Sequence, residues 1–314
     1  MKPILPGSAK LGFIGIGYMG RPIAQRLLQA GFSVAVFDRH TSNAEKLTPY
    51  GGIVAKDIAA LAASCDVILS CLANDQAVLD VHLGAQGTLA NIRPDSLIIE
   101  MSTVSPGTAR QVSQHASARS IPVLDVTISG STPAAETGSL VLFGGGPQGL
   151  FEASAPIFRA IARSYFYLGP NGSGATMKLV VNTLLGVGMQ AIAEAVALGE
   201  KAGLERGRLL AVLAQTAVVA PAHAGKLSRA ANGDFSPQFP VRLMNKDFGL
   251  ILGLAAAVGA EMPAARAAFE VNANRLEQAK EEDFSAVILE MEARDHVLPV
   301  EEEHPRSTTA SGER

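Results

Sequence analysis

Three glycines near the N-terminus constrain the fold of this chain more than any other feature. Gly15, Gly17 and Gly20 follow an apolar run and precede a helix-like segment with Pro22 in its first turn. A side chain at the first glycine would clash within a tight turn, at the second it would hold a pyrophosphate away from the backbone, and at the third it would separate helix from strand. The pattern predicts a strand, a phosphate-binding turn and a helix whose N-terminus faces the phosphates.

A second apolar run supports a dinucleotide site. It covers residues 33–37 and leads into Asp38, which lies 18 residues after Gly20, where a ribose 2′-hydroxyl needs an acceptor. Asp38 would also repel a 2′-phosphate, which favours NAD, while Arg39 directly after it leaves NADP as the alternative. An ordinary strand, turn and helix, whose glycines only relieve strain, is the competing interpretation.

Composition argues against several function classes. The chain has 314 residues, 26 of them basic and 29 acidic, and its net charge of −3 offers no general attraction for nucleic acid or anionic lipid. Cys65 and Cys71 are the only cysteines and fit neither a disulfide framework nor a zinc spacing, and the histidines are scattered, so we expect reduced thiols and no metal. The N-terminus lacks the apolar stretch of a secretory signal, and we expect a cytoplasmic protein.

The pattern of elements predicts an α/β fold. Strand-like runs alternate with helical patterns, which indicates a parallel sheet with helices on both faces, at residues 11–16, 34–37, 67–71 and 97–101. Three runs at closer spacing should extend the same sheet, partly antiparallel, at residues 123–128, 140–143 and 165–168. From residue 175 to about 294 the pattern is helical.

We therefore expect a Rossmann-type doubly wound sheet followed by an all-helical domain. The limits are 1–168 for the dinucleotide-binding domain and 169–295 for a helical domain that serves the substrate and oligomerisation. Residues 296–314 are polar and are expected to be a disordered tail. The most apolar later stretch, 179–193, is interpreted as a buried helix, too short to span a bilayer.

Lys178 is the outstanding candidate for chemistry. It lies near the start of an apolar helical segment, and Asn182 follows four residues later, so both side chains project from one face. Desolvation in such a helix would lower the pKa of the lysine toward a value useful for proton transfer. A lysine that extends from the first turn into solvent is the alternative on spacing alone.

Two further polar groups stand among apolar neighbours. Residues 129–132, Ser-Gly-Ser-Thr, follow a strand where backbone N–H groups and hydroxyls could receive a carboxylate, although such a turn can also be structural. Lys246 could attract an anionic substrate, and Asp247 could orient it or cap the next helix. Residues 169–176 resemble a P-loop, but Ala175 stands where the phosphate-binding lysine is needed, which argues against ATP.

Taken together, these motifs resemble the β-hydroxyacid dehydrogenase family, which includes 3-hydroxyisobutyrate dehydrogenases and glyoxylate/succinic semialdehyde reductases and is related to 6-phosphogluconate dehydrogenases. The resemblance runs from about residue 11 to residue 293. Four motifs occur in the family's order, namely the glycine turn at 12–20, the substrate motif at 125–131 with 138–140, the lysine motif at 172–182 and the pair Lys246 and Asp247.

The resemblance implies a role for each matched residue. Lys178 would be the catalytic lysine, exchanging a proton with the reacting oxygen while a hydride moves to or from nicotinamide. Substrate would contact Ser129, Gly130, Ser131, Asn182, Lys246 and Asp247. The cofactor, NAD with NADP as the alternative, would contact Gly15, Ile16, Gly17, Tyr18, Met19, Gly20, Asp38, Arg39, Leu72, Ala73, Asn74, Thr103 and Lys246.

The chain departs from the family pattern at four positions. Ser131 replaces the second glycine of the substrate motif and Thr127 its usual proline, which suggests a reshaped carboxylate pocket. Ala73 replaces a frequent proline, and Glu100 a frequent aspartate.

The leading hypothesis is an NAD-dependent dehydrogenase or reductase of a short β-hydroxy acid or its semialdehyde, a small carboxylate. An imine reductase or reductive aminase of the same architecture is the first alternative, although those relatives commonly have aspartate or tyrosine at the position of Lys178. A non-catalytic dinucleotide-binding module is the second. Alanine-rich helical patterns at 250–258 and 264–271 suggest a homodimer or homotetramer.

Overall fold

The computed structural model describes residues 2–295, so the expected tail at 296–314 lies outside the described residues. The described chain divides into two compact units, residues 2–188 with 236–284 and residues 189–235 with 285–295. All residues with a predicted site role fall in the first unit. The domain limits 1–168 and 169–295 remain a prediction.

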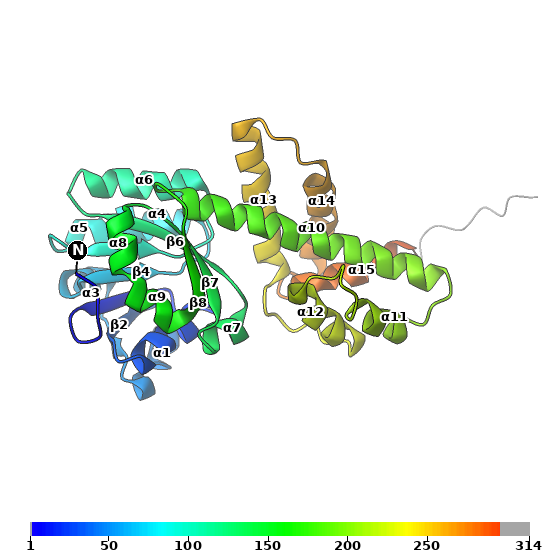
Figure 1. Ribbon diagram of the computed structural model, residues 1–314, viewed down its shortest axis with the longest axis horizontal. Coiled ribbons are helices and arrows are strands. Elements are labelled where there is room, and N and C mark those ends of the chain that lie inside the picture. Colours follow the sequence, from blue (N-terminus) through cyan, green and yellow to red (C-terminus); the bar gives the residue numbers. More distant parts are fainter. Residues whose placement is uncertain (1, 296–314) are drawn as a thin grey trace, which may run out of the picture. The chain divides into compact units, whose positions relative to one another are not determined.

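One eight-stranded sheet organises the first unit (Figure 1). Its order is β3-β2-β1-β4-β5-β6-β7-β8. The strands are β1 Lys10–Ile14, β2 Ser33–Phe37, β3 Ile53–Val54, β4 Val67–Ser70, β5 Leu97–Glu100, β6 Val123–Ser129, β7 Leu140–Gly145 and β8 Ala162–Tyr167. Pairing is parallel from β3 to β6, antiparallel between β6 and β7, and parallel between β7 and β8, as the sequence predicted.

The chain reverses its winding direction between β1 and β4. It passes from β1 outward through β2 and β3, and then returns to pair β4 with the other side of β1. In sheets of this kind, ligands bind outside the carboxyl ends of the strands at the switch point. The loops after β1 and β4 therefore border the expected cofactor crevice.

Helices cover both faces of the sheet (Figure 1). Residues of α1, α7, α8 and α9 pack on one face with alternate strand residues such as Phe13 and Leu69. The other face packs against α3, α4, α5 and α6 through strand residues such as Ile14 and Ile68. Because both faces are buried, the strands have continuous apolar runs. These helices are α1 Gly20–Gln29, α3 Ile58–Ser64, α4 Asp75–Leu83, α5 Thr88–Asn91, α6 Pro106–Ser117, α7 Thr132–Glu136, α8 Gln148–Ala153 and α9 Ala155–Ile161.

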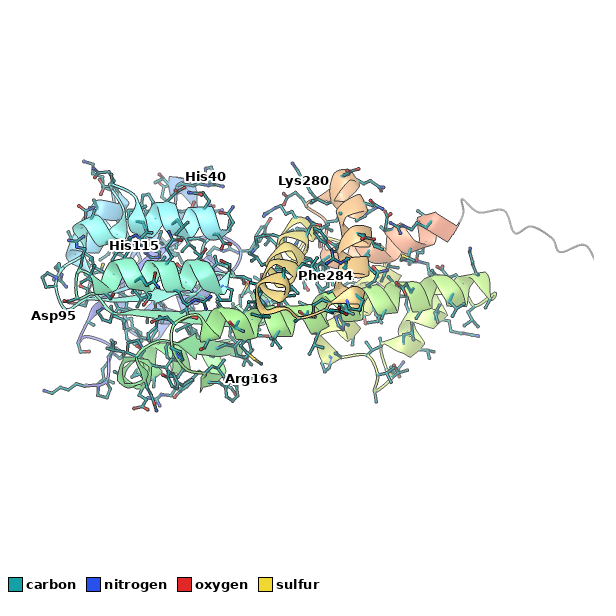
Figure 2. All side chains as sticks on the ribbon, turned by 90° about the horizontal axis from the view of Figure 1, so that it is seen from above. His40, Asp95, His115, Arg163, Lys280 and Phe284 are labelled. Carbon is teal, nitrogen blue, oxygen red and sulfur yellow. The ribbon has the colours of Figure 1, made fainter. Side chains whose placement is uncertain are left out.

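The remainder of the described chain is helical, as expected. Short helices α2 Thr41–Glu45 and η1 Thr48–Tyr50 follow β2, and the later helices are α10 Ser173–Lys201, α11 Arg206–Leu213, α12 Pro221–Ala231, α13 Val241–Val258, α14 Pro263–Ala279, η2 Phe284–Ala286 and α15 Val287–Asp295. Phe284, labelled in Figure 2, donates its backbone N–H to Phe239 O at 2.9 Å, and the two rings pack edge to face at 5.7 Å. This contact packs Phe284, the last residue of the first unit, against Phe239 of the same unit.

The second unit is held by ion pairs and helix packing. Arg206 at the start of α11 donates from Nε to Glu292 Oε1 on α15 at 2.7 Å and from Nη1 to Ala230 O at the end of α12 at 3.1 Å. One guanidinium therefore connects three helices of this unit.

The structure corrects several local predictions. Strand β3 is only two residues long, too short to show a periodicity, and it was missed. The stretch at 179–193 is part of a 29-residue helix, α10, so the argument that it is too short to span a bilayer was wrong. By length and composition alone α10 could cross a membrane, with 39% of its most apolar window buried. Cys65 is buried but Cys71 only partly so, and both are free thiols.

Candidate active site

The glycine turn after β1 has the geometry that the sequence predicted. Gly15 has a φ of +93°, and a Cβ there would lie 2.3 Å from Cys71 O. At Gly20 a Cβ would lie 1.9 Å from Gly15 O, so only glycine lets helix α1 approach the turn. At Gly17 a Cβ would meet nothing within 4 Å. The open space beside Gly17 is where a backbone of this kind receives a pyrophosphate, so the turn fits a dinucleotide.

Asp38 at the end of β2 is tied to this turn. Its Oδ2 accepts the Ile16 N–H at 2.8 Å, and its Oδ1 accepts the backbone N–H of His40, labelled in Figure 2, at 2.9 Å. Asn43 Nδ2 donates to the same Oδ1 at 3.3 Å. The carboxylate therefore fixes the glycine turn as well as bordering a hollow of about 240 Å³ whose lining includes Thr41, Val54 and Lys56. Arg39 is exposed, and so is Tyr18 on the turn.

The loops after β4 and β5 lie side by side, because these strands are parallel neighbours. Leu72 donates its N–H to Ser102 Oγ at 2.7 Å, which joins the two loops directly. Asn74 caps α4 by accepting the Ala77 N–H at 2.9 Å, and Ala73 before it is exposed. Thr103 is partly buried.

The start of α10 is anchored to β6 by a buried carboxylate. Asp125 Oδ1 accepts the Gly172 N–H at 2.9 Å, and Oδ2 accepts the Ala175 N–H at 3.0 Å. Burial raises the pKa of Asp125, while these backbone donors act to lower it. Thr127 Oγ1 donates to Gly174 O at 2.8 Å, so this threonine ties strand to helix from a buried position and does not line a pocket. Lys178 follows one turn later on α10.

The surroundings of Lys178 tune its charge. Desolvation by burial lowers its pKa from 10.5 to about 8. The carboxylate of Asp247 acts in the opposite direction, and the ammonium of Lys246 adds to the lowering. Cys71 also lies close enough to affect this pKa, and burial raises the pKa of its own thiol to about 12. With a pKa of about 8, both forms of the lysine are populated at physiological pH, so the ammonium can give a proton and the neutral amine can take one.

Asn182, Asp247, Lys246 and Thr103 form one connected chain of contacts. Asn182 Nδ2 donates to Asp247 Oδ2 at 2.5 Å, and Lys246 Nζ lies 2.8 Å from Asp247 Oδ1. Lys246 Nζ also donates to Thr103 O at 2.5 Å. Asn182 and Asp247 are each only 1% exposed.

Asn182 retains one unsatisfied acceptor. Its Oδ1 is buried and has no hydrogen-bond partner among residues 2–295. A buried polar atom without a partner costs free energy, so it is a suitable acceptor for a hydroxyl of a bound substrate.

One expectation about Asp247 was wrong. It lies inside α13, six residues after the helix begins, and therefore caps no helix. Asp247 instead accepts a hydrogen bond from Asn182, which joins α13 to α10.

The predicted carboxylate loop lies at the end of β6. Ser129 is its last strand residue, Gly130 has a φ of +134°, and Ser131 precedes α7 without capping it through its side chain. Among the described residues no hydrogen bond joins Ser129 or Ser131 to Lys178.

Two supporting residues were missed as site residues. Asp125, although quoted in the substrate motif, was not given a role, and its signal was a carboxylate within an apolar strand. Glu100 was noted only as a departure, and it proves to be 2% exposed and hydrogen bonded to the loop after its own strand.

Comparison with known proteins agrees with this geometry. Residues 10–169 match the family model described as the NAD binding domain of 6-phosphogluconate dehydrogenase. Residues 172–291 match the model described as NAD-binding of NADP-dependent 3-hydroxyisobutyrate dehydrogenase. The two models together cover the glycine turn, the lysine helix and the Lys246 and Asp247 pair.

Individual relatives cover nearly the whole described chain. Glyoxylate/succinic semialdehyde reductase 2 of Arabidopsis thaliana is 34% identical over 91% of this chain and 80% of its own length. The NAD-dependent L-serine dehydrogenase of Pseudomonas aeruginosa is 35% identical over 88% of this chain and 96% of its own. The structure of Mycobacterium tuberculosis 3-hydroxyisobutyrate dehydrogenase with L-serine has a TM-score of 0.81 and 31% identity, covering 90% of this chain and 98% of that one.

Some relatives are longer proteins that are not named as dehydrogenases or reductases. The chain is 32% identical to the cytokine-like nuclear factor N-PAC of Xenopus tropicalis over 90% of its own residues, and it spans about half, 53%, of that relative. The same fold is thus present in a larger protein.

Proposed function

The chain belongs to the β-hydroxyacid dehydrogenase family of NAD(P)-dependent enzymes, and from this premise we propose that it moves a hydride between NAD(H) and a short β-hydroxy acid or its semialdehyde, with Lys178 as general acid and base. The observation that carries the proposal is the buried Oδ1 of Asn182, which lacks a partner among the described residues and stands one helical turn after Lys178 on α10. The lowered pKa of Lys178 supports it.

The cofactor is assigned to the switch point of the sheet. The open backbone at Gly17 would hold the pyrophosphate, and the hollow beside Asp38 would receive the adenosine half. Leu72, Asn74, Thr103 and Lys246 would border the nicotinamide half. When bound, the cofactor supplies or accepts the hydride.

Lys178 would handle the proton of the reaction. In the reducing direction the carbonyl carbon gains the hydride, the C=O π electrons move to oxygen, and the ammonium of Lys178 donates the proton that completes the hydroxyl. In the oxidising direction the neutral amine accepts that proton. Asn182 Oδ1 would accept from the hydroxyl and so orient it.

The substrate carboxylate is assigned to the loop after β6. Backbone N–H groups at Gly130 and Ser131, with the hydroxyl of Ser129, would receive it. Thr127 takes no part, because its hydroxyl is bonded to Gly174 O inside the fold. The altered pocket therefore depends on Ser131.

NAD is the proposed first choice of cofactor. Asp38 already accepts three hydrogen bonds from the protein, which fixes its carboxylate beside the hollow where a 2′-phosphate would meet its negative charge. Lys56 lines the same hollow and Arg39 follows Asp38 directly, and both support NADP as the alternative.

A homodimer or homotetramer is proposed for the assembly. Val180 and Leu184 lie on α10 and are 50% and 72% exposed within the chain, an apolar surface that a second copy would cover. Light scattering across a hundredfold range of concentration tests this, and a constant monomer mass would contradict it.

The direct test is cofactor oxidation followed by absorbance, with NADH and NADPH separately. The panel contains glyoxylate, succinic semialdehyde, tartronate semialdehyde, methylmalonate semialdehyde and a cyclic imine. L-serine is tested in the oxidising direction, because one relative is named an L-serine dehydrogenase and the structure of another holds L-serine. We expect NADH oxidation by at least one semialdehyde.

Each other result has a distinct meaning. Turnover of the cyclic imine with none of the semialdehydes would replace the proposal with imine reduction. Tight NADH binding without turnover of any carbonyl or of L-serine would favour a non-catalytic dinucleotide-binding role. Equal or faster turnover with NADPH would overturn the cofactor preference alone.

A further inference from the structure

A buried polar network lies at the carboxyl ends of β4 and β5. Ser70 and Glu100, the last residues of the two strands, are register partners, and Ser70 Oγ donates to Glu100 Oε2 at 2.5 Å. His82 on α4 has its Nε2 2.8 Å from the same carboxylate oxygen and 3.1 Å from Ser70 Oγ. Thr88 Oγ1 lies 2.7 Å from His82 Nδ1. Each of these side chains is at most 2% exposed.

The network is not a hydrolytic triad, although it has the same residue types. In a triad the nucleophile and the carboxylate contact opposite nitrogens of the imidazole. Here Ser70 and Glu100 both lie at Nε2, and Thr88 lies at Nδ1. Ser70 has no exposed surface, so no substrate reaches its hydroxyl.

The second oxygen of Glu100 leads to the cofactor edge. Glu100 Oε1 accepts the Ser102 N–H at 2.6 Å, and Ser102 Oγ in turn accepts the Leu72 N–H at 2.7 Å. One carboxylate therefore connects the loop after β5 with the loop after β4. The carbonyl of the next residue, Thr103, accepts from Lys246 Nζ, so the connection reaches the polar cluster formed by Thr103, Lys246, Asp247 and Asn182.

The length of the side chain suits this task. Glu100 stands where the family often has aspartate, and its additional methylene separates the carboxylate from its own backbone. One oxygen can then meet Ser70 and His82 while the other meets Ser102. The hydrogen bonds on both sides hold the carboxylate in one orientation.

We propose that Glu100, held by Ser70 and His82, is a positioning residue that fixes loops 71–74 and 101–103 as one rigid surface for the nicotinamide cofactor. It acts through Ser102 and Leu72. The inference rests on the proposed function, which assigns Leu72 and Thr103 to the cofactor.

The decisive variant is Glu100→Gln. An amide has one acceptor oxygen and one NH2 group, so it cannot accept on both sides. Either the bond from the Ser102 N–H or the contacts with Ser70 and His82 that orient the side chain are lost, while the side-chain volume is kept. We expect the dissociation constant for NADH, measured by fluorescence, to rise about tenfold, with kcat at saturating cofactor and substrate within about threefold of the wild type.

Two serine variants test whether the effect passes through Ser102. Ser102→Ala removes the acceptor of the Leu72 N–H and should weaken NADH binding, as Glu100→Gln does. The double variant Glu100→Gln with Ser102→Ala should be no weaker than the worse single variant, because both break one connection. Ser154→Ala is the matched control, since it removes an equally buried hydroxyl between α8 and α9, and it should change NADH binding less than twofold.

Hydrogen exchange of the cofactor-free protein separates this inference from the proposed function. Peptides covering 71–74 and 101–105 should exchange faster together in Glu100→Gln and in Ser102→Ala, and not in Ser154→Ala. Unchanged exchange and unchanged NADH binding in both Glu100→Gln and Ser102→Ala would overturn the inference and leave the proposed function intact. A lowered melting temperature without a change in NADH binding would also overturn it, since that result indicates a structural role only. If the wild type reduces no substrate and peptides 71–74 and 101–105 still exchange faster in both variants than in the wild type, the inference is supported and the proposed function is rejected.

Discussion

The glycine turn after β1 draws its residues from one segment, 15–20. The polar cluster around Asn182 joins Thr103, Asn182 and Asp247 from three segments far apart in the chain. The turn depends on absent side chains, because a Cβ at Gly15 or Gly20 would collide with backbone oxygen. The cluster depends on present ones, joined by hydrogen bonds between α10, α13 and the loop after β5.

The difference predicts separate contributions of the two regions to cofactor affinity and to the rate of the reaction. The turn is complete within the fold and offers open space to a ligand at Gly17. The cluster is incomplete, since the buried Asn182 Oδ1 has no partner among the described residues. Four residues before Asn182 on α10, burial lowers the pKa of Lys178. We therefore expect changes in the turn to affect cofactor affinity and changes in the cluster to affect the rate of the chemical step.

The largest expected effect comes from Lys178→Ala. It removes the proton donor, and kcat for semialdehyde reduction should fall about a thousandfold, with NADH affinity within about threefold of the wild type. Lys178→Arg is the control for charge, because it keeps the cation but does not release a proton near neutral pH, so it should be almost as inactive. Retention of more than a tenth of the wild-type rate in Lys178→Ala would reject the lysine as the acid.

Gly17→Ala should have the opposite signature and a smaller effect. A Cβ at this position meets nothing within 4 Å, so the folded protein accommodates it, but the methyl group occupies space assigned to pyrophosphate. The dissociation constant for NADH should rise about tenfold to a hundredfold, with the melting temperature little changed. Gly149→Ala on α8, where a Cβ also meets nothing within 4 Å, is the matched control. Equal NADH affinity in both variants would show that no phosphate approaches Gly17.

The turn and the order of the elements could be predicted because their signals are local. Glycine spacing specifies a turn, and alternating apolar segments specify a sheet with helices on both faces. Lys178 and Asn182 were placed on one face correctly, since four residues bring side chains together on any α-helix. The short strand β3 gave no periodicity to detect.

The rest of the site depends on tertiary contacts that no local pattern encodes. Asp247 was expected to orient a substrate or to cap a helix, and only the packing of α13 beside α10 makes it the partner of Asn182. His82 and Glu100 carry no shared motif, and they meet because α4 returns toward the end of β5. The resemblance to a family identified Lys246 and Asp247 without indicating this geometry.

The smallest expected effect is a pair of opposite shifts in the pH at which kcat/KM declines. It tests whether the charges of the cluster set the pKa of Lys178. Reduction needs the ammonium form of Lys178, so kcat/KM should decline as the pH rises through about 8, the pKa of that group. Asp247 raises this pKa and Lys246 lowers it. Asp247→Asn should therefore move the midpoint of the decline to lower pH, and Lys246→Gln should move it to higher pH. Measurement at saturating NADH removes any contribution from cofactor binding. Shifts in the same direction would mean that both variants act by disturbing the packing of α13 against α10, and the charges would then have no tuning role.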